Sequence, residues 1–222
     1  SITIPNSVTS VGNGAFSGCS NLNEVHISDL SAWCNIDFVN SPLSNTGNLY
    51  LNGELVTDLV IPDGVTEIKD YAFSGFSSLT SVTIPNSVTS IGEYAFDGCK
   101  ALTSVTIGSG VTSIGKDAFH GCNKITSISS HIPAENLTEI SDFSRSFYRR
   151  CTLYVPFGAT EVYASTSGWD GFVNIVEMDF TDIDEVKEQK ADVRVIYDLH
   201  GRVVDTPAKG IYIINGKQVL IK

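Results

Sequence analysis

The chain has 222 residues, a formal net charge of −11, and 42% hydrophobic against 18% charged residues. This apolar content excludes an acidic disordered chain, and the apolar runs are far shorter than the roughly 20 residues that a membrane-spanning helix needs. Phosphate binding needs a basic surface, so the acidic charge predicts no nucleic-acid partner. The length allows one large domain or a domain with an appendage.

A 23-residue repeat occupies most of the chain. The segment that begins at Ile61 recurs at Ile84 and again at Ile107, and a related copy begins at Ile4. From Ile27 to Ile61 the interval is 34 residues, so one rung carries an insertion of 11 residues. Apolar positions that recur at constant spacing predict a mainly β solenoid of about five rungs, because no single repeat buries its apolar face alone. Since the sequence starts in mid-repeat, we expect further rungs before it.

Each rung is expected to contain two short strands and a turn. Alternation places Val82 and Ile84 on the buried face of the first strand and Ser81 and Thr83 on its solvent face. Pro85 lacks the amide hydrogen that a ladder needs and ends this strand. A second short strand follows. One helical or 3₁₀ turn then buries a further set of side chains, Ala95, Phe96 and Cys99.

The consensus of these rungs is I-P-x-x-V-T-x-I-G-x-x-A-F-x-G-C-x-x-L-x-x-V-x-I. This string resembles the BspA-type leucine-rich repeat, which occurs on surface and secreted proteins of Bacteroidetes and other host-associated microbes. The resemblance covers residues 1–177, with a capping segment over 129–177. It implies a leucine-rich-repeat solenoid at the bacterial surface or outside the cell, with a non-catalytic adhesion or protein-binding role. It supplies no residue-level binding site.

The insertion and the C-terminal tail depart from the repeat. The insertion lies within residues 27–60 and ends in a hairpin that we expect to turn at Asn52–Gly53. Charged residues over 178–191 predict a linker. Residues 192–222 predict a small antiparallel hairpin module with a turn at Asn215–Gly216, and this module resembles the C-terminal β-module of secreted Bacteroidetes proteins, some of which are sorting signals.

The cysteines predict packing rather than chemistry. Cys19, Cys99 and Cys122 occupy one repeat position, which Phe76 fills in another rung. A position that accepts either residue is a buried apolar one, where a free thiol acts as a small hydrophobe. Five cysteines without a CxxC pair also argue against a disulfide scaffold.

No motif for catalysis, a metal or a cofactor occurs in the sequence. The four histidines, His26, His120, His131 and His200, lack metal-ligand spacing. His120 occupies a variable turn position and is expected to be exposed. Known nucleophile, phosphate-loop and dinucleotide motifs are lacking as well. We therefore predict a protein that is not an enzyme and needs no cofactor.

The outward face of the strand ladder is the main candidate surface for a protein partner, because solenoids bind partners through such faces. The alternative is that Ser and Thr occupy these positions only because they are favourable on an exposed sheet, with no partner bound. A second candidate is a glycan-binding insertion with Trp33 and Tyr50 as a stacking platform, and a third function is that of a passive surface spacer. A monomer is expected. The ladder candidates form two columns: Glu24, Asp58, Ser81, Ser104 and Ser127 in the first, and His26, Val60, Thr83, Thr106 and Ser129 in the second.

Overall fold

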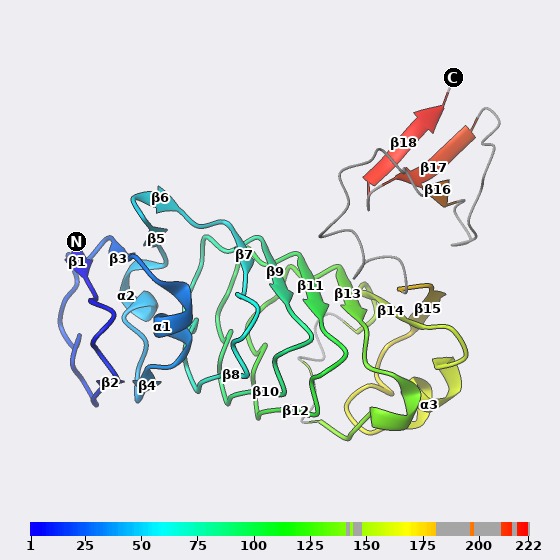
Figure 1. Ribbon diagram of the computed structural model, residues 1–222, viewed down its shortest axis with the longest axis horizontal. Helices are drawn as coiled ribbons and strands as arrows, with labels where there is room; N and C mark the ends of the chain where they lie inside the picture. Colours follow the sequence, from blue (N-terminus) through cyan, green and yellow to red (C-terminus); the bar gives the residue numbers. More distant parts are fainter. Residues whose placement is uncertain (141–142, 144–147, 181–195, 198–209, 215–216, 222) are drawn as a thin grey trace. The chain divides into compact units, whose positions relative to one another are not determined.

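The computed structural model describes residues 1–140, 143, 148–180, 196–197, 210–214 and 217–221. The chain divides into two compact units, Ser1–Val176 and Glu177–Lys222. The first unit is a solenoid whose rungs follow one another along its long axis (Figure 1). The second contains three antiparallel strands. The fold class is therefore mainly β, as the sequence predicts.

A six-stranded parallel ladder forms the longest face of the solenoid. Its order is β15-β14-β13-β11-β9-β7, so β7 is an edge strand. Neighbouring strands pair at the repeat spacing, with Ser81 opposite Ser104 and Ser104 opposite Ser127. The strands are β7 (Asp58–Val60), β9 (Ser81–Ile84), β11 (Ser104–Ile107), β13 (Ser127–Ser130), β14 (Thr152–Pro156) and β15 (Asn174–Met178).

Shorter strands form the opposite edge of each rung. Each consists of two residues, of which the second is buried, because only one side chain per strand points inward. Pro85 and Val88 close the turn between the two faces, with the Val88 amide donating to the Pro85 carbonyl. One sheet contains β8 (Glu67–Ile68), β10 (Ser90–Ile91) and β12 (Ser113–Ile114), and a separate pair contains β2 (Ser10–Val11) and β4 (Asp37–Phe38).

The N-terminal rungs form a second, separate ladder. Its order is β1-β3-β5-β6, and no backbone ladder joins it to β7 in the described part of the chain. The predicted columns treat the two as continuous, and this is wrong: the hairpin of β5 and β6 ends the first ladder before the second begins. The elements are β1 (Ile2–Thr3), β3 (Val25–Ile27), α1 (Leu30–Cys34), α2 (Leu43–Thr46), β5 (Leu49–Leu51) and β6 (Glu54–Leu55).

The hairpin turns where the sequence predicts. Asn52 and Gly53 both have positive φ, 52° and 89°, which is the signature of a type I′ turn. Strands β5 and β6 pair antiparallel, with Leu51 opposite Glu54. This hairpin diverts the chain out of the rung path before β7.

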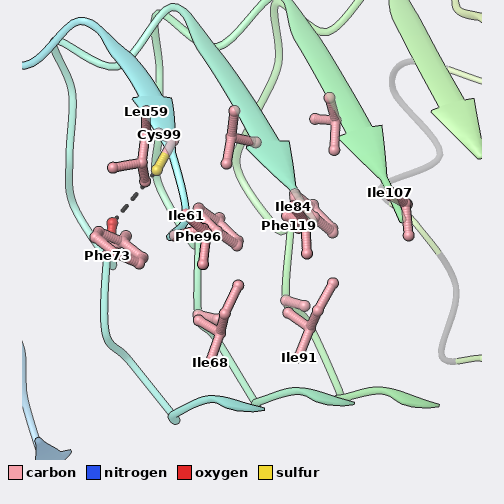
Figure 2. Packing of buried hydrophobic residues seen from close by; sticks show 14 of the residues in the cluster. Leu59, Ile61, Ile68, Phe73, Ile84, Ile91, Phe96, Cys99, Ile107 and Phe119 are labelled. Carbon is pink, nitrogen blue, oxygen red and sulfur yellow. Dashed lines mark hydrogen bonds between the residues drawn. The ribbon is translucent and has the colours of Figure 1, made fainter. Parts of the chain in front are cut away.

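The core of the solenoid is a stack of equivalent apolar side chains (Figure 2). Phe73, Phe96 and Phe119 lie face to face, with ring centroids 5.3 and 5.2 Å apart. All three are buried. Cys99 and Cys122 are also buried, and their thiols donate to the carbonyls of Phe73 and Phe96 at 3.4 and 3.0 Å. The shared position is therefore a packing position in these two rungs.

Cys19 is exposed, against the expectation that its slot is buried. The neighbouring rung replaces the A-F-x-G-C turn with α1, β4 and α2, so it offers no equivalent turn to cover the thiol. The residue before Ala-Phe in each turn has a left-handed backbone, which the sequence reasoning missed. Gly14 is one such residue, and the others are Tyr71, Tyr94 and Asp117, with φ between 54° and 58°.

An aromatic cap closes the C-terminal end of the first unit. Phe143 packs edge-on against Trp169 and Phe172 at 5.3 and 5.5 Å. The buried Tyr163 hydroxyl donates to the Ile132 carbonyl at 2.9 Å, and burial raises its pKa. These contacts hold two short helices, η1 (Ala134–Asn136) and α3 (Thr160–Ser165).

The described part of the second unit is an antiparallel sheet in the order β16-β17-β18. Ile214 lies opposite Lys217, so a hairpin joins the last two strands. The predicted linker lies outside the described residues from position 181 on, and so does the turn at Asn215–Gly216. The strands are β16 (Ile196–Tyr197), β17 (Gly210–Ile214) and β18 (Lys217–Ile221).

Candidate binding surface

The outward side of the six-stranded ladder presents two rows of aligned side chains, polar except for Val60, which we name the hydroxyl face. Register pairs the members of each row one above another. Thr83 is exposed, and most of the other members are half-buried by their own neighbours. The first row is Asp58, Ser81, Ser104 and Ser127, and the second is Val60, Thr83, Thr106 and Ser129.

The rows extend one strand further than the sequence reasoning reached. On β14, Thr152 continues the first row and Tyr154 continues the second. The sequence does contain the alternation that predicts this strand: Leu153 and Val155 are the buried residues, and Pro156 ends the strand. The break in the 23-residue spacing before this strand hid the alignment.

Asp58 gives the first row a negative end. Its carboxylate accepts hydrogen bonds from the hydroxyls of Ser81 at 2.5 Å and of Thr80 and Thr57 at 3.1 Å each. These bonds, the Ser81 one first, lower the pKa of Asp58 below its usual value of 3.8. The carboxylate is therefore charged and held in place at neutral pH.

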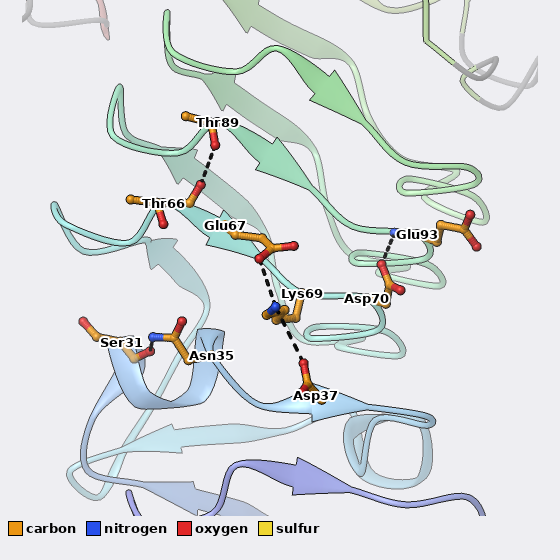
Figure 3. A network of polar contacts seen from close by, with 9 residues as sticks. All are labelled: Ser31, Asn35, Asp37, Thr66, Glu67, Lys69, Asp70, Thr89 and Glu93. Carbon is orange, nitrogen blue, oxygen red and sulfur yellow. Dashed lines mark hydrogen bonds and ion pairs between the residues drawn. The ribbon is translucent and has the colours of Figure 1, made fainter.

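Threonine hydroxyls at the corners of the rungs are a separate set. They donate hydrogen bonds to the neighbouring rung and are not part of the hydroxyl face. The hydroxyl of Thr80 donates to the carbonyl of Thr57 at 2.9 Å, and that of Thr103 donates to Thr80 at 3.0 Å. Thr89 does the same toward Thr66 on the opposite edge, at 3.0 Å (Figure 3). Each carbonyl also accepts the backbone amide of the same threonine, so the hydroxyl adds a second hydrogen bond between neighbouring rungs and these threonines are structural.

Glu24 and His26, the first members of the predicted columns, lie on the separate N-terminal ladder. His26 is opposite Tyr50, and the two rings stack with centroids 4.8 Å apart. The Glu24 carboxylate lies 3.0 Å from His26 Nε2. The sequence predicts Tyr50 as part of the insertion but not as the neighbour of His26.

Trp33 does not belong to any surface. It is 1% exposed, and its indole Nε1 donates to the carbonyl of Ala72 at 3.0 Å. Asp29 caps α1 by accepting from the amides of Ser31 and Ala32, and the helix turns Trp33 toward the core. The predicted stacking platform of Trp33 and Tyr50 is therefore wrong, because a buried indole cannot stack on a sugar.

A single cation bridges the gap between β4 and β8 (Figure 3). Lys69 Nζ lies 2.9 Å from Glu67 and 3.7 Å from Asp37. These acidic neighbours, Glu67 first, raise the pKa of Lys69. Other rungs carry glycine at this position, and Lys69 fits because the preceding rung does not press against it.

The titratable groups of the described residues are dispersed over the solenoid. They include no cluster of three or more His, Cys, Asp or Glu that could hold a metal ion. All five cysteines are free, and burial raises the pKa values of the Cys34 and Cys151 thiols to about 12. His120 is exposed, as expected, and its Nδ1 lies 2.8 Å from Asp97. No helix among the described residues is long and apolar enough to span a membrane.

The stacked rungs, parallel ladders and repeated turns define a leucine-rich-repeat solenoid. The profile of the BspA type leucine rich repeat region matches six copies over residues 1–47 and 46–156. The chain therefore belongs to the BspA-type leucine-rich repeat family.

Solved bacterial structures show similarity to the chain. A leucine rich cell surface protein from Faecalibacterium prausnitzii A2-165 is 25% identical, with a TM-score of 0.44 over 79% of this chain and 59% of its own. A leucine-rich repeat protein from Eubacterium ventriosum ATCC 27560 is 23% identical, with a TM-score of 0.41 over 80% of this chain. The chain spans 42% of that protein. A search of curated proteins found no match.

Proposed function

We propose that this chain is a non-catalytic protein-interaction module of a bacterial surface or secreted protein, and that it binds its partner through the hydroxyl face as a monomer. The observation that carries this proposal is the alignment of two polar rows across four parallel strands. Solenoids present such extended faces to partners. The family membership supports a role in protein recognition, and the surface-protein relative supports the location.

The chemistry of the hydroxyl face suits a polar, adaptable contact. Hydroxyls both donate and accept hydrogen bonds, so the rows can pair with partner backbone or side chains without strict charge matching. Asp58 adds a fixed negative end, which favours a partner with a complementary positive group. A Bacteroidetes origin and a sorting role for residues 192–222 remain predictions of the resemblance.

Capture of a partner tests the hydroxyl face directly. The immobilised chain is incubated with surface proteins released from epithelial cells and from bacteria, and bound proteins are identified. Lysine at Ser81, Thr83, Ser104 and Thr106 should abolish capture, because long cations cover both rows.

A charge-matched control carries four lysines on the opposite edges of the rungs, at Thr9, Ser10, Ser90 and Ser113. This control should capture as the unmodified chain does, and both variants should melt at similar temperatures. Unaltered capture by the first variant would exclude the hydroxyl face. Failure of the unmodified chain to capture any protein would favour the passive spacer.

A further inference from the structure

Among the residues that the structure describes, no strand pairs with the outer edge of β7. Thr57, Leu59 and Ile61 direct their backbone groups toward β9: the amides of Thr80 and Ser81 donate to Thr57, and that of Ile61 donates to Thr83. Because backbone groups alternate along a strand, those of Asp58 and Val60 point the other way. A rung would normally lie there, but β6 turns away.

A hollow lies beside this edge, between the hairpin and β7. Its volume is about 330 Å³, and its lining includes Leu30, Leu51, Leu55 and Val60. Leu55 is 44% exposed and Val60 is 61% exposed. These are two of the large apolar side chains that the first unit leaves exposed, and they flank one opening.

Two carboxylates lie at the same opening. Glu54 and Asp58 line the hollow and are exposed. Asp58 is fixed by the hydroxyls of Ser81 and Thr80, so its charge has a defined position. A basic side chain on an occupant would meet both a carboxylate and the apolar edge.

We propose that the notch between β6 and β7 binds an extended peptide segment of a protein partner, which adds as a strand to β7 and carries a basic and an apolar side chain two residues apart on one face. Strand addition is favoured because the two outward backbone positions, Asp58 and Val60, offer donors and acceptors at a two-residue spacing that an extended peptide matches. Glu54 and Asp58 select a basic side chain, and Val60 an apolar one. The inference rests on the proposed protein-binding function and concerns the β7 end of the hydroxyl face, where Asp58 and Val60 also border the hollow.

The test uses a fluorescently labelled peptide, acetyl-Thr-Lys-Val-Val-Lys-Thr-amide, and the full chain. Fluorescence anisotropy gives the affinity, and residue-resolved hydrogen exchange shows where the peptide lies. The amides of Asp58 and Val60 should exchange rapidly in the free chain and become protected at saturation, whereas the amide of Ile61 is protected in both states. A peptide methylated on alternate backbone nitrogens should bind about tenfold more weakly, since it lacks the donors.

Protein variants separate backbone pairing from charge. Val60→Pro removes the outward amide of the edge strand, a position where proline is tolerated, and should weaken the peptide about tenfold. Asp58→Asn keeps the hydroxyl contacts and should remove the preference for the lysine peptide over its glutamate counterpart. A control with lysine at Ser104 and Thr106 changes the hydroxyl face alone and should leave the affinity within about twofold.

Three results would overturn the proposal: no binding of the peptide, equal binding of its methylated form, or equal binding of its glutamate counterpart. Each is measured on the unmodified chain, so none depends on whether a variant folds. The capture assay depends on the lysines placed on β9 and β11, whereas the peptide assay reads the outward amides of Asp58 and Val60 on β7. Capture of a partner protein without binding of the peptide would overturn the notch alone.

Discussion

The rungs from Asp58 to Ser130 and the rungs from Val25 to Thr57 solve the same stacking problem in different ways. In the first region each residue lies over its equivalent 23 residues away, and backbone and hydroxyl bonds recur at that separation. In the second, β3 still pairs with β1 and β5, but single contacts join the variant rung to the next one: Trp33 to the Ala72 carbonyl, Lys69 to Asp37 and the Ser78 amide to the Gly47 carbonyl. Many weak, equivalent contacts therefore hold the regular rungs together, whereas a few individual contacts hold the variant rung.

This difference also explains where surfaces open. A regular rung covers the edge of its neighbour completely, because the two are the same shape. The hairpin at Asn52–Gly53 removes that match, and the hollow beside β7 lies next to it. Substitutions in the regular stack and substitutions in the variant region should therefore affect stability differently.

The largest effect is expected from Phe96→Ala. Phe96 lies between Phe73 and Phe119 and is fully buried, so its removal leaves a cavity with rings on both sides. We expect a loss of about 3–5 kcal/mol in the free energy of unfolding, measured by urea denaturation. Phe16→Ala, at the half-buried equivalent in the first rung, should cost about 1 kcal/mol. Equal losses would mean that a ring stacked on both sides by its neighbours in adjacent rungs stabilises the fold no more than a half-buried one.

Gly92→Ala should have the next largest effect. A Cβ atom at Gly92 would lie 2.5 Å from the amide nitrogen of Asp70, whereas one at Gly12 would meet nothing within 4 Å. The clash is with backbone, so we expect a loss of about 1–3 kcal/mol for Gly92→Ala. Gly12→Ala should change stability by less than about 0.5 kcal/mol. A similar cost for both would show that the glycines are needed for backbone conformation and not for the close approach of rungs.

Trp33→Phe tests the hydrogen bond from the Trp33 indole to the Ala72 carbonyl, which joins the variant region to the next rung. The change removes the indole donor and leaves the buried Ala72 carbonyl without it, at a cost of about 1–3 kcal/mol. Hydrogen exchange should accelerate in α1 while β9 and β11 keep their protection. Uniform acceleration across all rungs would contradict the idea that Trp33 acts locally.

The sequence predicts the regular region well because one rule repeats there. Alternation as in Ser81–Ile84 and the buried Ala-Phe turn recur in every regular rung, so one rung predicts the others. The closing Pro85 has an equivalent in Pro62 but is replaced by Gly108 in the third copy. The left-handed backbone at Tyr71 and Tyr94 escaped prediction, since tyrosine normally disfavours positive φ and only the stacked turns hold it there.

The variant region was harder to predict because nothing repeats in it. Trp33 was expected on the surface, since the insertion offered no rung to align it with, and its burial depends on an Asp29 cap whose effect is visible only once α1 is placed. Cys19 was expected to be buried by analogy with Cys99, but burial depends on the adjacent rung and not on the residue itself. Binding by the hydroxyl face stays a prediction.

The smallest effect is expected on the free energy of unfolding at low pH. The folded-state pKa of Asp58 is below its usual value of 3.8, chiefly through the Ser81 hydroxyl, so its bonds stabilise the fold above about pH 4. This stability is lost as the pH falls below 3.8 through the folded-state pKa. Since Asp58 is exposed, solvent screening limits the contribution to a few tenths of a kcal/mol.

Ser81→Ala should raise the Asp58 pKa toward its usual value, as measured by NMR titration of the carboxyl carbon. The destabilisation caused by Asp58→Asn at pH 7 should diminish as the pH falls below 3.8, because the Asp58 carboxyl becomes protonated and then is neutral like the amide. The measurement also sharpens the contrast between the regions, because Asp58 lies at their junction and its partners Thr80 and Ser81 belong to the regular rungs alone. An unshifted pKa of Asp58 would mean that the hydroxyls of Thr80 and Ser81 do not stabilise its carboxylate.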